Sequence, residues 1–359
     1  MKFHPSPEWS DQNLGCFRLS TSSDSPAFEK EKQVLDAMTL NDPWVKLAAA
    51  YNFIGDQPAL VRLLEQHPEA VVSGADLLAA EKNWEPVIAA FSRLITSETT
   101  DATLLSKRAA AFVSTKQWEL AKADWLRAIE LKPDQLQQAF DTFRNAERWS
   151  EASEFGRKLI EQKPAVESWR WLSVAAVVAP AGDWAAYTEF CNRMLQQFAD
   201  SEDVNDAERT TKVGLLRPDM IDVSKLPADK FTKTLDDGTA PEGFKPWGWA
   251  TRALLAYRDG DPAAAVKYVA RSEEFSPTDF AHALNLAVLP LAQHQLQHPN
   301  EARSAFEEAS QLITRLSEDT SKRDDKDLLI AEILHREADT KINGKTEPKP
   351  AGDAAIPQP

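Results

Sequence analysis

The residues from Leu104 to Pro133, LLSKRAAAFVSTKQWELAKADWLRAIELKP, restrict the fold of this chain more than any other stretch. Their apolar positions recur at helical spacing on both sides of a polar turn, which predicts two short amphipathic helices. Small residues stand where the two helices must touch, and large residues fill the space between them. These residues are Ala109, Ala121 and Ala128, and then Phe112, Trp118 and Trp125. Pro133 ends the second helix because its nitrogen has no hydrogen to donate. Such a pair cannot bury its apolar face alone, so the stretch predicts similar pairs stacked on both sides.

The same layout recurs along the chain. Trp84 lies 34 residues before Trp118, and Trp149 and Trp184 follow after steps of 31 and 35. The recurrence predicts an all-α fold in which helix pairs stack into a superhelix. It also bears on the high count of 11 tryptophans. Sugar binding or base stacking is the alternative use of so many indole rings, but their repeat position favours packing between helices.

The order aromatic residue, Ala, bulky residue, Ala and Pro is held here by Trp118, Ala121, Trp125, Ala128 and Pro133. It resembles the tetratricopeptide repeat. That resemblance implies a tetratricopeptide-like α-α solenoid, whose first helices line a concave groove.

Residues 1–28 fall outside the helical pattern. Leu14 to Thr21 alternates in polarity between turn-forming residues, which predicts one β-strand. The segment HPSPEWSDQNLGCFRLSTSSD resembles the closing strand of the β-sandwich modules that precede repeat regions in large planctomycete proteins. We therefore expect a severed, poorly ordered β-sandwich remnant here, at the start of the carboxy-terminal part of a longer ancestral chain.

The rest of the chain divides by its periodicity. We expect a tetratricopeptide-like array over residues 29–199, beginning with a connecting helix, and further repeats with a capping helix over residues 247–341. Residues 200–246 contain one expected helix, Val204 to Leu216, and are otherwise predicted to be an irregular linker, a spacer or a functional loop. Residues 342–359 are rich in proline and polar residues, which predicts a disordered tail.

Three further details of the repeats follow from particular residues. Asp42 and Gly55 are expected to cap a helix at its two ends. Pro290 stands where the repeat pattern has a small helix former, which predicts a kinked helix. The apolar run Leu328 to His335 is expected to cover the last exposed face of the stack.

Several segments in order, among them DPWVKLAAAYNFIGDQPAL, AERTTKVGLLRPD and WATRALLAYRDGDPAAA, resemble the carboxy-terminal repeat region of planctomycete multidomain serine/threonine protein kinases. This implies a detached regulatory or targeting region of such a kinase. The glycine-rich loop, the HRD-type segment and the DFG motif that phosphoryl transfer needs are all missing, so we expect no kinase activity. An enzyme with an unrecognised site, or a gene fragment without a role of its own, remains an alternative.

Charge and motifs exclude several classes. The chain has 56 acidic and 41 basic residues and a formal charge of −15, which disfavours nucleic acid as a partner. The acidic surface attracts basic peptides or merely keeps the chain soluble. Neither a signal peptide nor an apolar run of 18 residues occurs, and only Cys16 and Cys191 are present, so we expect a cytoplasmic protein without disulfides or membrane contact. We expect no cofactor, since no nucleotide-binding motif occurs, and no metal, since His298 beside Pro299 suits metal binding poorly.

Protein or peptide binding in the groove is the preferred interpretation, with the partner's identity and the oligomeric state left open. By register, the groove residues that do not pack the core are Gln137, Asp141, Arg144, Asn145, Trp169, Arg170, Tyr257 and Arg258. Arginine beside exposed aromatic rings is typical of binding hot spots, although polar groove residues are often merely solvated. Ser106 and Ala110 hold places where some tetratricopeptide modules clamp a terminal carboxylate with Lys and Asn, so we do not expect that activity.

Overall fold

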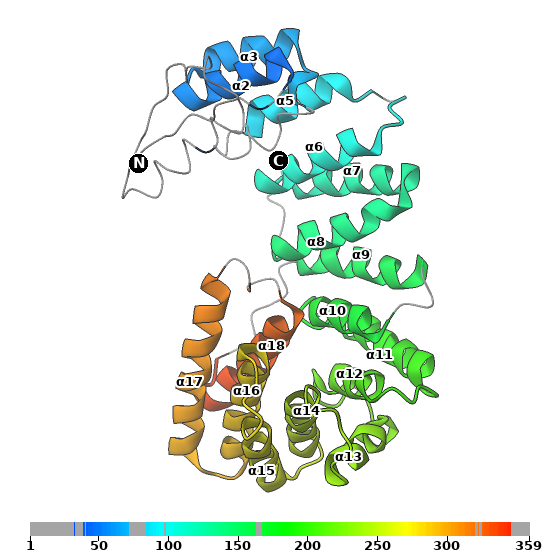
Figure 1. The fold of residues 1–359 in the computed structure, drawn as a ribbon, viewed down its shortest axis with the longest axis vertical. Coiled ribbons are helices and arrows are strands. Elements are labelled where there is room, and N and C mark those ends of the chain that lie inside the picture. Colours follow the sequence, from blue (N-terminus) through cyan, green and yellow to red (C-terminus); the bar gives the residue numbers. More distant parts are fainter. Residues whose placement is uncertain are drawn as a thin grey trace, which may run out of the picture. The chain divides into compact units, whose positions relative to one another are not determined.

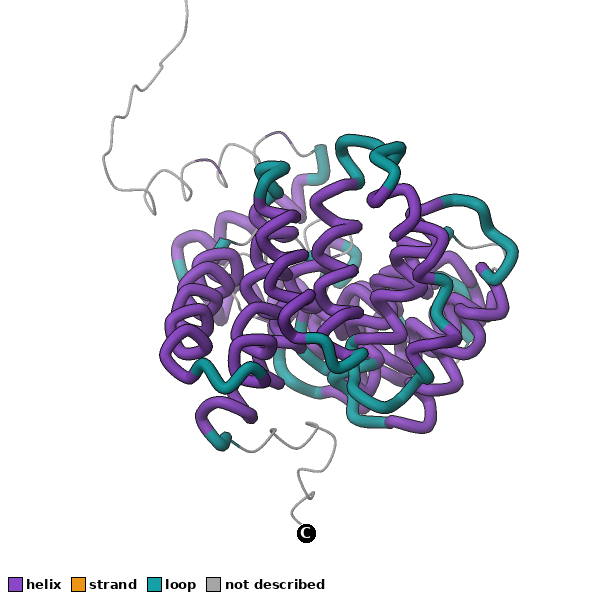
Figure 2. Tube along the Cα trace, turned by 90° about the horizontal axis from the view of Figure 1, so that it is seen from below, coloured by secondary structure: helices purple, strands orange, loops and turns teal. Residues whose placement is uncertain are grey.

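The computed structural model describes residues 32, 39, 41–71, 84–96, 98–162, 167–319, 322 and 325–345. Within these ranges the chain forms α-helices and short 3-10 turns and no strand, so the all-α class is confirmed (Figure 2). The predicted strand Leu14 to Thr21 lies outside the described residues, and of the connecting helix at 29–41 only residues 32, 39 and 41 are described. The predicted tail from residue 346 onward also lies outside the described residues.

Contacts divide the chain into two compact units, Met1–Gln117 and Trp118–Pro359. The first unit contains α2 (Pro43–Ile54), α3 (Gln57–Gln66), α5 (Trp84–Leu94) and α6 (Ala102–Ser114), each packed against the next. Both predicted caps of α2 are confirmed. The Asp42 carboxylate accepts hydrogen bonds from two backbone N–H groups of the first turn, and Gly55 ends the helix with φ 75°. Only glycine adopts such a left-handed backbone without strain.

The second unit begins with five helices that follow the tryptophan pattern. They are α7 (Trp118–Leu131), α8 (Leu136–Asn145), α9 (Trp149–Gln162), α10 (Ser168–Val178) and α11 (Trp184–Phe198). Packing between helices, the favoured use of the repeated tryptophans, is only partly observed. Trp125 is fully buried, but Trp184 is 38% exposed, and Trp118 and Trp149 are only half-buried. Since these rings stand at the first residue of a helix, they lie at the rim of the helix pair.

Residues 200–246 are not an irregular linker. The expected helix is present as α12 (Val204–Leu215), but a 3-10 turn, η3 (Val223–Lys225), and α13 (Ala228–Asp236) follow it. Phe231 and Leu235 of α13 pack with Phe244 in a buried apolar cluster. Because α12 contacts α10, α11, α13 and α14, this segment continues the stack and does not separate two arrays.

The remaining helices are α14 (Lys245–Arg258), α15 (Pro262–Glu273), α16 (Asp279–Gln295), α17 (Pro299–Glu318) and α18 (Lys326–Asn343). Pro290 lies inside α16, which continues through it to Gln295. The last helix extends well beyond the predicted run of 328–335 and through the first two residues of the expected tail, to Asn343. None of the described helices combines the length and the apolar character needed to cross a membrane.

Five helices of the second unit close into a cycle, which we call the inner ring. Each of α10, α12, α14 and α16 contacts the next, α16 contacts α18, and α18 returns to α10 (Figure 1). Leu328, Ile330 and Leu334 of α18 are fully buried, because helices of the ring and α17 surround it. The predicted capping helix therefore covers its neighbours in sequence and also closes the array on itself.

Candidate functional site

The side of α8 that faces away from the buried core carries a stripe of polar residues. Leu136, Phe140 and Phe143 are buried, which turns the opposite side of the helix away from the core. Gln137, Asp141, Arg144 and Asn145 follow at intervals of four, three and one residues, so they share one face. These are four of the residues predicted from the repeat register.

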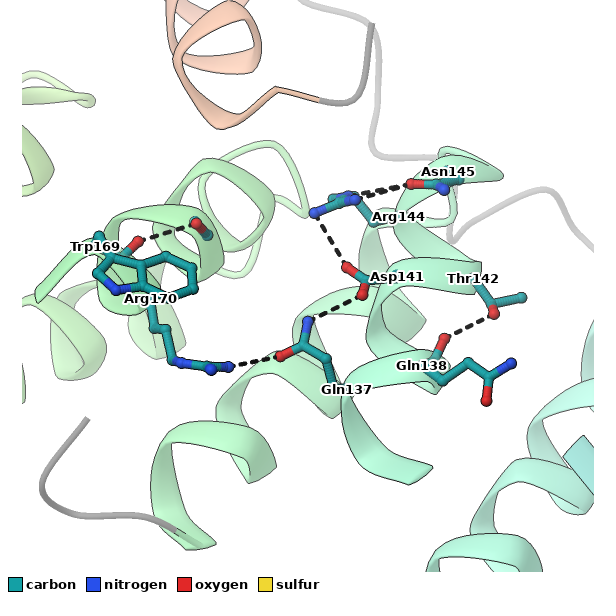
Figure 3. Close-up of polar contacts among 9 residues, drawn as sticks. Gln137, Gln138, Asp141, Thr142, Arg144, Asn145, Trp169 and Arg170 are labelled. Atoms are coloured by element: carbon teal, nitrogen blue, oxygen red, sulfur yellow. Dashed lines mark hydrogen bonds and ion pairs between the residues drawn. The ribbon is translucent and has the colours of Figure 1, made fainter. Parts of the chain in front are cut away.

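Hydrogen bonds connect these side chains to the next inner helix (Figure 3). Arg170 on α10 donates through Nη1 to Gln137 Oε1 at 3.0 Å, and Gln137 Nε2 donates to Asp141 Oδ2 at 3.0 Å. Arg144 Nη1 lies 3.1 Å from Asp141 Oδ1, and its Nε and Nη2 each donate to Asn145 Oδ1 at 3.2 Å. We call these five residues the polar ladder. Six of the eight predicted groove residues are thus brought together, if Trp169 at its end is included.

Trp169 presents an aromatic face beside the ladder. Its side chain is 39% exposed, and its indole N–H donates to Glu167 Oε2 at 2.6 Å. The guanidinium of Arg170 lies 4.7 Å from the ring centroid. The hydrogen bond and the cation–π contact both restrict the rotamer of Trp169, so a partner that stacks on it would meet a ring already held in place.

The close approach of α8 and α10 to α9 depends on a glycine that the pattern did not single out. A Cβ atom at Gly156 of α9 would lie 2.9 Å from Phe140 Cε2 on α8 and 2.9 Å from Val174 Cγ1 on α10. Since real Cβ atoms do not approach so closely, this position brings together the two helices that carry the ladder.

A cleft of about 420 Å³ adjoins the Arg144 end of the ladder. Residues of α8, α9, α17 and α18 line it, and we call it the α8–α18 cleft. The end of α8 contributes Arg144 and Asn145, the turn that follows contributes Glu147, and α9 begins with Trp149. From α17 come Ser310, Ile313, Thr314 and Ser317, and from α18 come Leu329, Glu332, His335 and Arg336.

Two titratable groups in the cleft are perturbed by burial. Desolvation raises the pKa of Glu332, although Ser317 Oγ donates to its Oε1 at 3.0 Å and Arg336 Nη2 lies 3.8 Å from its Oε2. Burial lowers the pKa of His335, whose ring stacks on Phe306 at 4.4 Å between centroids. His335 is therefore neutral at pH 7, and its Nε2 lies 2.8 Å from Ser310 Oγ.

Tyr257 and Arg258 lie elsewhere. The Arg258 side chain is only 6% exposed and is bound to Glu337 of α18, while the Tyr257 hydroxyl donates to Glu337 Oε1 at 3.3 Å. Both residues therefore contact α18 rather than the polar ladder, and they line a separate cavity of about 620 Å³ together with Arg217 and Asp222. That they bind a partner stays a prediction.

Sequence reasoning missed the α8–α18 cleft itself. The repeat pattern marks Trp149 only as the first residue of a helix, and no local signal indicates that Glu332 and His335, 183 and 186 residues further on, line the same space.

No protein-family model matches this chain, and no curated protein matches it. Among solved structures, it is similar to a tetratricopeptide repeat protein from Parabacteroides merdae. The sequence identity is 10%, the similarity covers 73% of this chain and 99% of that chain, and the TM-score is 0.29. Similarity at that level does not indicate a function. The all-α fold is established by the helices of this chain itself. The resemblance to kinase tails rests on its sequence segments alone.

Proposed function

We propose that this chain is a non-catalytic scaffold that binds a protein or peptide along the polar ladder, between Trp169 and the α8–α18 cleft. The polar ladder carries the proposal, because its side chains are linked to one another before any partner arrives. A partner that binds them need not order long side chains, which lowers the entropic cost of association. The exposed Trp169 supplies the large aromatic contact that binding hot spots favour.

A selection from a random-peptide display library on the immobilised full-length chain tests this function. Trp169→Ala removes the aromatic contact and Asp141→Ala breaks the ladder, and Trp184→Ala is a matched control because Trp184 is 38% exposed at the start of another helix. We expect the selected peptides to bind W169A and D141A about tenfold more weakly, and W184A as they bind the unchanged chain. Failure to enrich any peptide, or equal binding to all variants, would overturn the proposal.

A further inference from the structure

Within the described residues, a lysine or arginine lies over six indole rings, both buried and exposed. At the start of α7, the Arg148 guanidinium lies 4.8 Å from the Trp118 ring centroid, and at the start of α11 Arg217 lies 4.5 Å from that of Trp184. Lysine or arginine also lies over Trp169, Trp171, Trp247 and Trp249. Such stacking lets a guanidinium use the negative face of the ring, and it is strongest where water is excluded.

Trp149 has the same register as Trp118 and Trp184, because it opens α9 as they open α7 and α11. Arg148, the residue before Trp149, covers the tryptophan of the preceding repeat. The matching residue before Trp184 is Asp183, whose carboxylate accepts from the Ala186 N–H at 3.0 Å and caps α11. The next repeat therefore offers Trp149 no cation, and within the described ranges no cation–π contact is made to it. It lines the cleft instead.

The charges around Trp149 leave room for one more cation. Arg144 is held by Asp141 and Asn145 of the ladder. Arg336 donates through Nε to the Glu332 backbone carbonyl at 3.3 Å and forms an ion pair with the Glu332 carboxylate, its Nη2 lying 3.8 Å from Oε2. Glu147 and Glu332 both line the cleft, and after desolvation by burial the negative charge of Glu147 also raises the pKa of Glu332. The three carboxylates Asp141, Glu147 and Glu332 face the two guanidinium groups of Arg144 and Arg336, so these residues together carry one net negative charge.

We propose that the α8–α18 cleft binds an arginine side chain of the partner, with the guanidinium stacked on Trp149 and paired with Glu332 and Glu147. The inference rests on the proposed function and specifies its partner as a basic peptide. The volume of about 420 Å³ is ample for one long side chain. A planar guanidinium suits the site better than an ammonium, because it stacks on an indole and pairs with carboxylates at the same time.

Titration of the full-length chain with N-acetyl-arginine amide, followed through the Trp149 indole N–H resonance, tests the cleft directly. N-acetyl-citrulline amide has the same shape without the charge and is the ligand control. Glu332→Gln and Glu147→Gln remove the proposed partners, and Glu308→Gln on the exposed side of α17 is the matched protein control. We expect citrulline to bind at least about tenfold more weakly than arginine, E332Q and E147Q to weaken arginine binding about tenfold, and E308Q to leave it unchanged.

The same experiments separate this inference from the proposed function. Equal binding of the two amides, or arginine binding that neither E332Q nor E147Q weakens, would overturn the arginine site. Selected peptides that lack arginine and bind E332Q normally would also overturn it, while leaving the proposed scaffold function intact. Conversely, arginine binding in the cleft with no peptide enriched in the selection would support the site and count against the scaffold.

Discussion

Arg258 of α14 donates to both carboxylate oxygens of Glu337 on α18, at 2.7 Å through Nη1 and 2.6 Å through Nη2. The two side chains are 6% and 10% exposed, and they join helices that lie about 80 residues apart in the sequence. Arg258 also donates through Nε to the Leu215 carbonyl at 2.9 Å, so its guanidinium binds α12 as well. This pair connects three of the five helices of the inner ring.

The first prediction concerns this ion pair. Glu337→Gln keeps the shape of the side chain but leaves the Arg258 charge buried without its counter-ion, and we expect a loss of about 3–5 kcal/mol in the free energy of unfolding. Urea denaturation followed by circular dichroism measures it. The double variant R258M/E337L, which removes both charges, should recover most of the loss. A loss below about 1 kcal/mol in E337Q would mean that the pair does not hold the ring closed.

Gly156→Ala tests the packing beneath the ladder. Alanine is the better helix former by about 1 kcal/mol, but its methyl group would overlap Phe140 and Val174. Overpacking of this kind costs about 1–3 kcal/mol, so we expect a net destabilisation of about 1 kcal/mol. Since α8 and α10 would move apart, binding of a selected peptide should also weaken. Unchanged stability together with unchanged peptide binding would contradict the role given to this glycine.

Cys191 should be chemically inert in the folded chain. Burial raises the pKa of its thiol to about 12, so at pH 8 the reactive thiolate is scarce. We expect iodoacetamide to modify Cys191 about a thousandfold more slowly than an exposed cysteine, and at an ordinary rate in concentrated urea. Peptide mapping by mass spectrometry distinguishes it from Cys16. Rapid labelling without urea would show that α11 opens locally.

Glu332 should reduce stability at neutral pH. Its folded-state pKa lies above its ordinary value of 4.5, so the folded chain binds more protons at this site than the unfolded chain does. The stability contributed by the protonated carboxyl is present below pH 4.5 and is lost as the pH rises through the raised pKa.

Glutamine imitates the protonated form at every pH. E332Q should therefore match the original chain below pH 4.5 and equal or exceed its stability at pH 7, as measured by urea midpoints at the two pH values. E308Q, at an exposed position, should show no such pH dependence relative to the unchanged chain. If E332Q were less stable at pH 7 only, the charged carboxylate would be stabilising, contrary to this reasoning.

The polar ladder shows how far repeat register leads. The spacing of Gln137, Asp141 and Arg144 places them on one face of a single helix, and Arg170 follows in the next inner helix, so their proximity follows from helix geometry and the order of the repeats. Tyr257 and Arg258 hold the corresponding places by the same register, but both donate to Glu337 of α18. Register identifies the concave side of a helix pair, but it does not indicate whether another helix already occupies that side.

Residues 226–246 show a second limit. Phe231, Leu235 and Phe244 are separated by charged residues and turn formers, and without neighbours they resemble a loop. They become a core cluster only because α12 and α14 supply apolar surface on either side, with Ala207 and Trp249 as members of the same cluster.

The sequence by itself determined the helical pairs, the caps at Asp42 and Gly55, and the stripe on α8, because each depends on residues within a few turns of one another. Tertiary structure alone decided the closure of the inner ring and the α8–α18 cleft. The curvature of a helical stack is the sum of small rotations at every packed pair, and each rotation depends on how side chains such as Phe140 and Val174 fit around Gly156. Periodicity records which face of a helix is apolar, but not the angle at which that face meets its neighbour, so the return of α18 to α10 appears only in three dimensions.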